Sequence, residues 1–442
     1  MINLNSRSRL LLLSFHLLLG LSLYNFQFLS TYFGYAIILI STYMIASYPD
    51  PKRILPLYFS FYIIGFEVLL RMTKAALFWE FGKYADIYFL FLGLIRGNKK
   101  ININIFVIFY FILLLPSIIN IPYDTINLWR QNVSFNLSGP ACLMMSALYI
   151  SNINISKNEM QKMLFISILP IVAMSVVVIF RMPILETYNF TPNSDFVTSG
   201  GYGPNQVSTI LGYGFLALIL LQVFKKPIFQ SKLIDYSLLG LFLGLGLLTF
   251  SRGGVLSSII AIVTSLSIYF FRGQYKTQIF FKTILLLVIS LSIWLIISMI
   301  TDGVIVERYG LKKGEYVENM IMDLTGRAQI YAIDIEIFKD NPITGVGPGQ
   351  AATLRPVYGY SKIAAAHTEY SRMLSEHGML GLFSLLLLFG ISIYHFFLTQ
   401  PIEKKLIQNI FGMLALLTMS HSAMRLSMAP FIFGFLFINY KE

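Results

Sequence analysis

Residues 163–180 read MLFISILPIVAMSVVVIF, eighteen consecutive positions without a charged side chain. As an α-helix, a stretch of this length measures about 27 Å, close to the ~30 Å hydrocarbon core of a bilayer. Comparable apolar runs recur along the whole 442-residue chain, in which 56% of residues are hydrophobic and 12% are charged. A soluble chain carries roughly 25% charged residues. The composition therefore excludes a water-soluble enzyme, a disordered chain and a disulfide-rich secreted scaffold.

The apolar runs predict helices rather than the strands of a membrane barrel. Lipid offers backbone groups no hydrogen-bond partner outside a helix or a closed barrel, and barrel strands are alternating segments of about ten residues. We expect an all-α fold, a polytopic transmembrane bundle of about 12–14 spans, because a spanning helix needs about 20 apolar residues. The candidate spans are residues 10–28, 31–48, 54–70, 84–95, 102–119, 133–150, 160–180, 205–224, 233–250, 254–271, 283–300, 377–398, 407–421 and 428–440.

The first span, 10–28, follows Arg7 and Arg9 and lacks a small-residue cleavage pattern, so we interpret it as a retained signal anchor. The fourth and the last spans are short. The single cysteine, Cys142, excludes an intramolecular disulfide and a cysteine-based metal site.

The distribution of basic residues predicts the orientation of the spans. With the amino terminus in the cytoplasm, 18 of the 33 lysines and arginines fall in cytoplasmic connections and 15 fall outside. Eight of those 15 lie in one long segment, residues 301–376, and long loops do not count in the positive-inside rule. The comparison of 18 against 7 predicts that both termini are cytoplasmic. Topology thus explains much of the +12 net charge without a nucleic-acid partner.

Seven basic residues remain in short outward loops. A cation beside hydrocarbon costs on the order of 3 kcal/mol on insertion scales, so it usually has a partner or a task. Individual side chains could reach lipid headgroups or pair with Glu67 and Glu80, whereas the group as a whole favours an anionic ligand on the outer face. The seven are Arg71, Lys74, Lys83, Arg130, Arg181, Arg252 and Arg425.

The long outward segment divides the chain into three parts. Residues 1–300 form a transmembrane bundle of about eleven spans, residues 301–376 a segment outside the membrane that contains short helices, and residues 377–442 the carboxy-terminal spans. Within 301–376, Thr325 is a plausible N-cap for a helix that ends at Asp340-Asn341-Pro342. An apolar stripe predicts that this helix lies against the membrane or the bundle, and it comprises Ile330, Ile333, Ile337 and Phe338.

Two features of this segment suggest chemistry. Gly345 and Gly347 belong to a turn-rich run whose bare backbone could approach a ligand or present N–H groups to phosphate, although most such runs are only turns. His367 carries an imidazole, a group that suits a general base near neutrality, and on a helix it would share a face with Ser371 and Leu374. A lone histidine is more often a surface residue without a task.

No metal site is predicted. Asp334 and Glu336 form an Asp-Ile-Glu triplet of the kind that binds metal in many glycosyltransferases. On a helix, however, positions i and i+2 point about 200° apart, so the two carboxylates cannot chelate one ion. The turn-rich run lacks the Lys-Ser/Thr of a nucleotide P-loop.

Several short motifs, taken in order, resemble the O-antigen ligase and O-antigen polymerase superfamily of bacterial inner-membrane glycosyltransferases. The resemblance covers about residues 200 to 390, and no single motif in it is specific. One departure is His367-Thr368, where the family commonly has His-Asn. The matching motifs are Gly203-Pro204-Asn205-Gln206, Ser251-Arg252-Gly253-Gly254, Gly326-Arg327, Asp340-Asn341-Pro342 through Gly349, His367-Thr368-Glu369-Tyr370 and Glu376-His377-Gly378 through Gly381.

The resemblance implies transfer of a glycan from an undecaprenyl-diphosphate carrier to an acceptor hydroxyl at the periplasmic face of the inner membrane. It implies catalytic roles for His367, Arg252 and Arg327, with no cofactor, no metal and inversion at the anomeric carbon. Arginine suits a diphosphate because its planar fork pairs with phosphate oxygens. Weaker candidates for substrate binding are Arg71, Arg181, Arg425, Asn205, Gly345, Gly347 and Tyr370.

The acceptor is the main alternative left open. A ligase would use a lipid A–core sugar, and a polymerase would use another carrier-linked repeat; the order of arginines and histidine around one long loop slightly favours the ligase. A flippase or transporter for lipid-linked oligosaccharides is a more distant alternative, although the two halves show none of the internal repeats that such proteins have. The expected partners are therefore the lipid-linked donor, one of these acceptors and membrane lipids.

Overall fold

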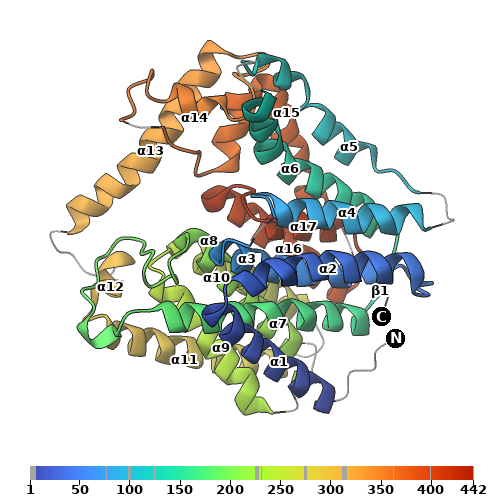
Figure 1. Cartoon of the computed structure of the whole chain (residues 1–442), viewed down its shortest axis with the longest axis vertical. Coiled ribbons are helices and arrows are strands. Elements are labelled where there is room, and N and C mark those ends of the chain that lie inside the picture. Colours follow the sequence, from blue (N-terminus) through green and yellow to red (C-terminus); the bar gives the residue numbers. More distant parts are fainter. Residues whose placement is uncertain are drawn as a thin grey trace.

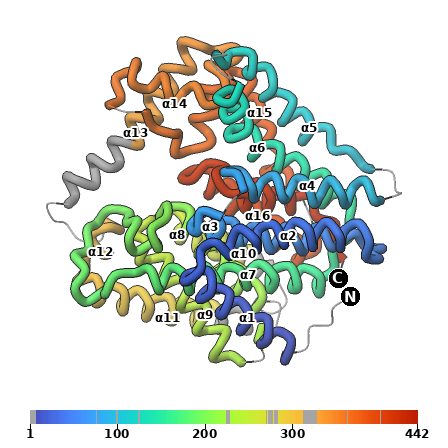
Figure 2. The backbone as a smooth tube through the Cα atoms, in the orientation of Figure 1, coloured from blue at the N-terminus to red at the C-terminus, as the bar shows by residue number. Residues whose placement is uncertain are grey.

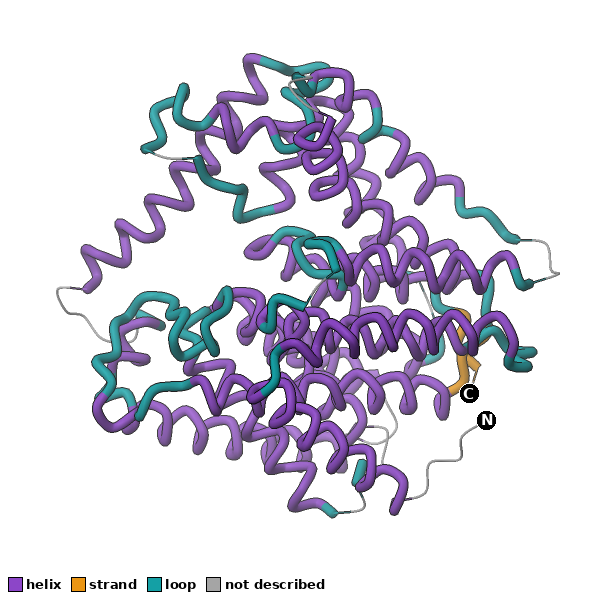
Figure 3. The backbone as a smooth tube through the Cα atoms, in the orientation of Figure 1, coloured by secondary structure: helices purple, strands orange, loops and turns teal. Residues whose placement is uncertain are grey.

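The computed structural model describes residues 6–75, 77–97, 101–122, 126–223, 228–229, 231–272, 276–310, 316–361, 363–398 and 400–441. Within these residues the chain forms seventeen α-helices, and its only strands are two three-residue segments (Figure 1). The predicted all-α fold is therefore confirmed. Figure 3 shows that loops occupy mainly the ends of the helices.

The helices follow one another through short connections. The amino-terminal part contains α1 (Ser6–Asn25), α2 (Phe28–Ser47), α3 (Leu55–Met72), α4 (Phe81–Ile95), α5 (Ile105–Ile112), η1 (Pro116–Asn120) and α6 (Ile126–Ser151). The middle contains β1 (Asn154–Ser156), α7 (Lys157–Arg181), η2 (Leu185–Thr187), α8 (Pro204–Val223), α9 (Lys232–Leu248), α10 (Arg252–Arg272) and α11 (Lys276–Ile300). The remainder contains α12 (Val304–Arg308), α13 (Tyr316–Asp340), α14 (Gln350–Leu354), α15 (Glu369–Phe397), α16 (Ile402–Ser422), α17 (Met428–Phe433), η3 (Gly434–Phe437) and β2 (Asn439–Lys441).

Each of the fourteen predicted spans overlaps a helix. Among the described residues, eight helices are long and apolar enough to cross a membrane, and shorter apolar helices cover 105–120, 252–268 and 428–437. The last predicted span, 428–440, is wrong as a full crossing, because α17 has six residues and gives way to η3 and β2. The apolar side chains of this segment pack within the protein, since every residue of α17 is buried.

The core of the bundle lies around α3, α7, α8, α10 and α16. Helix α7 packs against α1, α3 and α8, and α10 packs against α8 and α16. Nearly all side chains of α8 are buried, whereas α2 and α11 expose most of theirs, as expected for helices that face lipid. Figure 2 shows α16 and α10 running between α4 and α7, with α1 and α11 outside them.

Loops that the charge count assigns to one side of the membrane meet at one end of the bundle. Lys52 forms an ion pair with Glu159 at 2.8 Å, and Lys157 pairs with Glu403, which also accepts a hydrogen bond from Tyr440 at 2.9 Å. Strands β1 and β2 pair in parallel there, with Asn154 opposite Asn439. These contacts join connections that are predicted to be cytoplasmic.

The loops predicted to face outward meet at the opposite end, which we call the arginine end. Its loops are residues 73–75 and 77–80, 182–203, 249–251, 301–303, 341–349 and 423–427. Arg71 donates to the carbonyl of Arg425 at 3.1 Å, and Arg181 donates to the carbonyls of Met72 at 3.0 Å and Gly200 at 3.3 Å. The predicted alternation of sides therefore agrees with the way the connections are grouped.

Helix α13 differs from its prediction at one end only. It begins at Tyr316, so Thr325 lies inside the helix and the predicted N-cap is wrong. The residues before Thr325 include Met and Leu, which favour helix and extend it. The helix ends at Asp340 as expected, and Ile330, Ile333 and Ile337 are buried, which confirms the apolar stripe.

Candidate active site

Two of the short motifs meet where α8 and α10 begin. The Ser251 hydroxyl donates to Oδ1 of Asn205 at 2.6 Å, and the Ser208 hydroxyl donates to the carbonyl of Ser251 at 2.8 Å. A Cβ on Gly254 would lie 2.4 Å from the carbonyl carbon of Ser208, so only glycine allows the two helices to approach this closely. Asn205, a weaker candidate for substrate binding in the sequence, accepts this hydrogen bond from Ser251, the residue before α10.

This junction places Arg252 at the first residue of α10. Its guanidinium donates to the carbonyl of Arg308 at 3.1 Å, and Arg308 in turn donates to the carbonyl of Phe250 at 2.9 Å. On the other side, the adjacent Gly253 lies against His421: a Cβ there would be 2.5 Å from Cγ of the imidazole. The first turn of α10 is thus fixed between α12 and the end of α16.

Three further basic side chains, those of Arg327, Arg425 and Arg71, lie near His421 or near one another. Arg327, half-buried on α13, lies close enough for its charge to act on both His421 and Arg425. Burial lowers the pKa of Arg425, with Glu369 opposing and with Arg71 and Arg327 adding to the lowering. Arg425 donates to the carbonyl of Ala366 at 2.8 Å, and among the described residues no carboxylate pairs with it.

Arg71 occupies a buried position beside this group. It forms an ion pair with Glu67 at 2.6 Å, and its guanidinium lies 5.1 Å from the ring centroid of Trp79. Glu67 also accepts the Ser427 N–H at 2.7 Å. The pairing predicted as one alternative for the outward cations is therefore confirmed for Arg71, and a second buried pair, Lys83 with Glu80, shows the same arrangement.

His367 lies in the turn before α15, so the expectation that it sits on a helix with Ser371 and Leu374 is wrong. Helix α15 begins at Glu369. Its N-cap is Thr368, whose hydroxyl accepts the Ser371 N–H at 3.1 Å. An N-cap residue has extended backbone geometry, and the chain therefore turns away at His367. The carbonyls of Ala364 and Ala366, which precede His367, accept hydrogen bonds from Arg355 and Arg425.

A buried carboxylate connects this turn to the outer helices. Asp334 of α13 forms an ion pair with Arg355 at 2.5 Å and accepts the Ser371 hydroxyl at 2.7 Å. Burial raises the pKa of Asp334, while Arg355 and Ser371 oppose the shift. Glu336 is exposed, so the two acids of the triplet face in different directions, as predicted.

The glycine-rich run 345–349 packs against a kink in α15. Gly378 has φ 61° and ψ −140°, which breaks the helix and releases the carbonyls of Ser375 and Glu376. The N–H groups of Val346 and Gly347 donate to these two carbonyls at 3.0 Å each. A Cβ on Gly345 would lie 2.4 Å from the carbonyl carbon of Glu376, so this position requires glycine.

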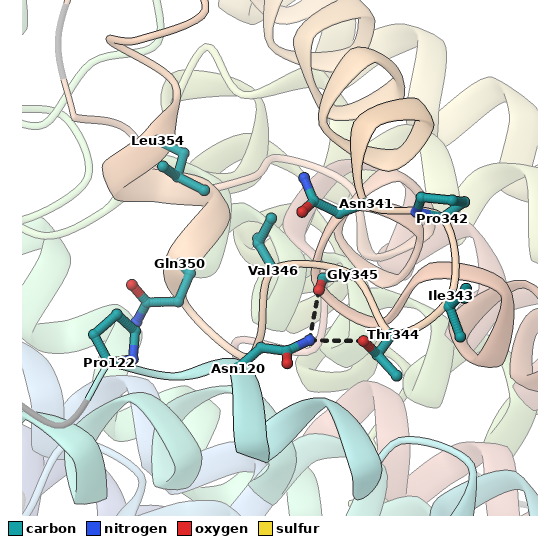
Figure 4. Close-up of a pocket in the computed structure, with 10 residues that line it drawn as sticks. All are labelled: Asn120, Pro122, Asn341, Pro342, Ile343, Thr344, Gly345, Val346, Gln350 and Leu354. Atoms are coloured by element: carbon teal, nitrogen blue, oxygen red, sulfur yellow. Dashed lines mark hydrogen bonds between the residues drawn. The ribbon is translucent and has the colours of Figure 1, made fainter.

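The outer side of the same run borders a cavity of about 510 Å³, drawn in Figure 4. The Asn120 amide donates to the hydroxyl of Thr344 and to the carbonyl of Gly345, both at 2.7 Å (Figure 4). The Gly345 N–H itself donates to the carbonyl of Asn341 at 3.1 Å. The N–H groups of Gly345 and Gly347 are therefore used within the fold, and these glycines shape the loop.

The remaining weak candidates lie apart from the arginines. The Tyr370 hydroxyl donates to the carbonyl of Leu416 at 2.7 Å, and its ring packs against Phe389. Arg181 donates to the carbonyl of Met72 at the end of α3 and to that of Gly200 in the loop before α8, and no contact to Arg252, Arg327 or Arg425 is seen among the described residues.

The structure also adds residues that were not predicted. His421 stands between Gly253 and Arg327, and both of its ring nitrogens are buried without a hydrogen-bond partner among the described residues. The polar run Ser420-His421-Ser422 at the outward end of a predicted span was the available signal. Arg308 lies in the long segment 301–376, where no neighbouring residue distinguishes it from the other basic residues.

An apolar groove of about 820 Å³ opens beside Arg252. It is lined by side chains of α8, α9, α10 and α11, and at one end by Trp294 and Tyr309, whose rings lie 4.8 Å apart edge to face. Arg252 and Arg308 lie close enough to Tyr309 for their charges to act on its hydroxyl. The end of the groove at Tyr309 therefore lies within electrostatic reach of two guanidinium groups.

The fold and this site define a multi-span helical membrane protein with arginines gathered at one end. Comparison with known families makes the class more specific: residues 237–386 match the family model described as O-antigen ligase. The match runs from α9 into α15 and includes Arg252, Arg327 and His367, so the resemblance seen in the motifs is confirmed over this region. No curated protein matches the chain.

Proposed function

We propose that the protein is a glycosyltransferase of the inner membrane that moves a glycan from undecaprenyl diphosphate to an acceptor sugar hydroxyl. The observation that carries the proposal is a chain of neighbours at the arginine end. The charge of Arg327 acts on His421 and on Arg425, and Arg425 donates to the carbonyl of Ala366, the residue before His367. His421 in turn lies against Gly253, the residue after Arg252. Several guanidinium groups that are partly buried at one end of the bundle favour a ligand with dense negative charge. The charge count supports the proposal that this arginine end faces the periplasm and that both termini are cytoplasmic.

The surroundings of the first turn of α10 suit both parts of the donor, its diphosphate and its polyprenyl chain. Arg252 and Arg327 would bind the diphosphate oxygens, and the apolar groove would receive the polyprenyl chain that follows them. Because lipid tails are as apolar as the groove, the polyprenyl chain gains no hydrophobic free energy on entering it. The groove instead fixes the position of the chain. Three arginines can neutralise a diphosphate, and the proposed reaction therefore uses neither a metal nor a nucleotide.

The transfer itself is a displacement at the anomeric carbon. The acceptor oxygen forms a bond to that carbon while the bond to the diphosphate oxygen breaks, and undecaprenyl diphosphate leaves with the electron pair. His367 accepts the proton of the acceptor hydroxyl, and the arginines stabilise charge on the leaving group. A single displacement of this kind inverts the anomeric configuration. His421, between Gly253 and Arg327, would add a neutral hydrogen-bond donor at the diphosphate.

The acceptor is proposed to be a lipid A–core sugar, which makes the protein an O-antigen ligase; the alternative within the same chemistry is a polymerase whose acceptor is another carrier-linked repeat. Deletion of the gene, followed by gel analysis of the surface glycans, tests this choice. Loss of all long glycan from lipid A, with carrier-linked polymer accumulating, is expected for a ligase. Core that carries a single repeat would indicate the polymerase instead. Unchanged glycans would refute both.

A further inference from the structure

A second, polar cavity of about 250 Å³ lies on the other side of Arg425. It opens between α4, α6, the start of α15 and the loop 423–425. A cavity of this size is far larger than the ~10–15 Å³ of such space that one water needs, so it gives room for a sugar ring. The residues that line it and enter the argument are Asn132, Phe135, Ala366, Glu369, Arg372 and Arg425.

The charged groups of this cavity are buried and held in place. Arg372 pairs with Glu369 on one side and with Glu376 at 2.7 Å on the other, and the three side chains are nearly inaccessible to solvent. Glu369 also accepts the Met424 N–H at 3.3 Å. Because Arg372 bridges both glutamates, these three side chains are held in fixed positions and present polar edges to the cavity.

One wall of the cavity carries the groups that recognise a sugar. Asn132 on α6 makes no side-chain hydrogen bond to any described residue, so its amide can both donate to and accept from ligand hydroxyls. One helical turn later, Phe135 presents an aromatic ring, which the Lys83 ammonium approaches to 5.7 Å. An aromatic face beside amides and carboxylates suits the apolar C–H face and the hydroxyl edge of a pyranose.

The position of the cavity distinguishes the acceptor from the donor. The apolar groove and Arg252 lie on the α10–α12 side of His421, whereas this cavity lies on the α4–α6 side of Arg425. Ala366, which lines the cavity, directly precedes His367 in the chain and is bonded to Arg425. The cavity therefore borders the chain segment that leads into His367.

We propose that this cavity is a subsite for one pyranose ring of the acceptor glycan, with Asn132 and Phe135 as its specificity-determining residues. The proposal rests on the proposed glycosyl transfer, since it assigns the acceptor side of that reaction. It holds a sugar ring, through hydrogen bonds and ring stacking, beside the segment that carries the proposed base.

Steady-state kinetics with the full-length protein in lipid nanodiscs test the assignment. Donor and both candidate acceptors, lipid A–core and carrier-linked repeat, are isolated from the deletion strain. We expect Asn132→Ala and Phe135→Ala each to raise the acceptor KM by about 3- to 10-fold, the effect of one or two lost neutral contacts, with the donor KM unchanged. The matched control is Ser134→Ala, since Ser134 lies between them on α6 but bonds to Tyr84. An unchanged acceptor KM in both variants, or an equal rise in donor KM, would overturn the assignment.

A labelling experiment separates this subsite from the proposed function. The natural Cys142 is buried, so Asn132→Cys and, as control, Ser134→Cys each add an accessible thiol for maleimide. We expect an acceptor preparation to slow labelling at position 132 at least fivefold and to leave position 134 unaffected, while undecaprenyl diphosphate without sugar protects neither. Protection without transfer would keep the subsite and refute the transferase; transfer without protection would do the reverse.

Discussion

Replacement of Arg252 and Arg327, singly and together, gives a quantitative test of the diphosphate site. A charge-assisted hydrogen bond contributes about 1.5–3 kcal/mol. At about 1.4 kcal/mol per factor of ten, we expect Arg252→Ala or Arg327→Ala to raise the donor KM by roughly 10- to 150-fold. Arg252→Lys keeps the charge but loses the planar fork, so we expect an intermediate effect.

The double variant distinguishes a shared ligand from two separate effects. If both guanidinium groups bind one diphosphate, the free-energy changes should deviate from additivity by about 0.5–3 kcal/mol. The assay is transfer by reconstituted protein at varied donor concentration, with the acceptor saturating. Arg130→Ala is the control, since Arg130 is an exposed outward arginine on α6 away from α10. A donor KM within twofold of wild type in both single variants would refute the role assigned to them.

Three further predictions concern the base, the absence of a metal and the loop. His367→Ala should reduce transfer by about 10²- to 10⁴-fold while the protein remains in the membrane with an unchanged melting temperature; near-normal transfer would remove His367 from catalysis. A chelator should leave transfer intact, and a loss that a divalent ion restores would contradict the proposed chemistry. Gly345→Ala should destabilise the fold by about 1–3 kcal/mol, because φ is 65° and the added Cβ meets α15 at 2.4 Å. Gly359→Ala shares the positive φ but has open space, so it should lower the melting temperature less.

Hydropathy predicted the helices because each must bury its backbone polar groups whatever its neighbours are. It could not distinguish a segment that faces lipid from one that is buried in protein. Residues 428–440 show this: the same apolar side chains that suggest a span pack inside the bundle as α17 and η3. Burial of this kind depends on the preceding helix α16 and on α6, which is distant in sequence.

The site was predicted in part, for a similar reason. Arg252, Arg327 and Arg425 could be placed outward by counting spans. The structure brings Arg327 within electrostatic reach of Arg425, and it connects Arg252 to them only through Gly253 and His421. The turn at His367 could not be foreseen from a helical pattern, since it depends on the N-cap Thr368 and on hydrogen bonds from Arg355 and Arg425. His421 escaped notice because its role follows from contact with Gly253, which only the fold creates.

The most direct test of the diphosphate site is a structure of the protein with undecaprenyl diphosphate bound in a lipid nanodisc. We predict that the diphosphate oxygens lie within hydrogen-bond distance of Arg252 and Arg327 and that the first isoprene units enter the groove beside Trp294 and Tyr309. A diphosphate bound at the opposite end of the bundle, or at the arginine end without contact to either guanidinium, would contradict the account.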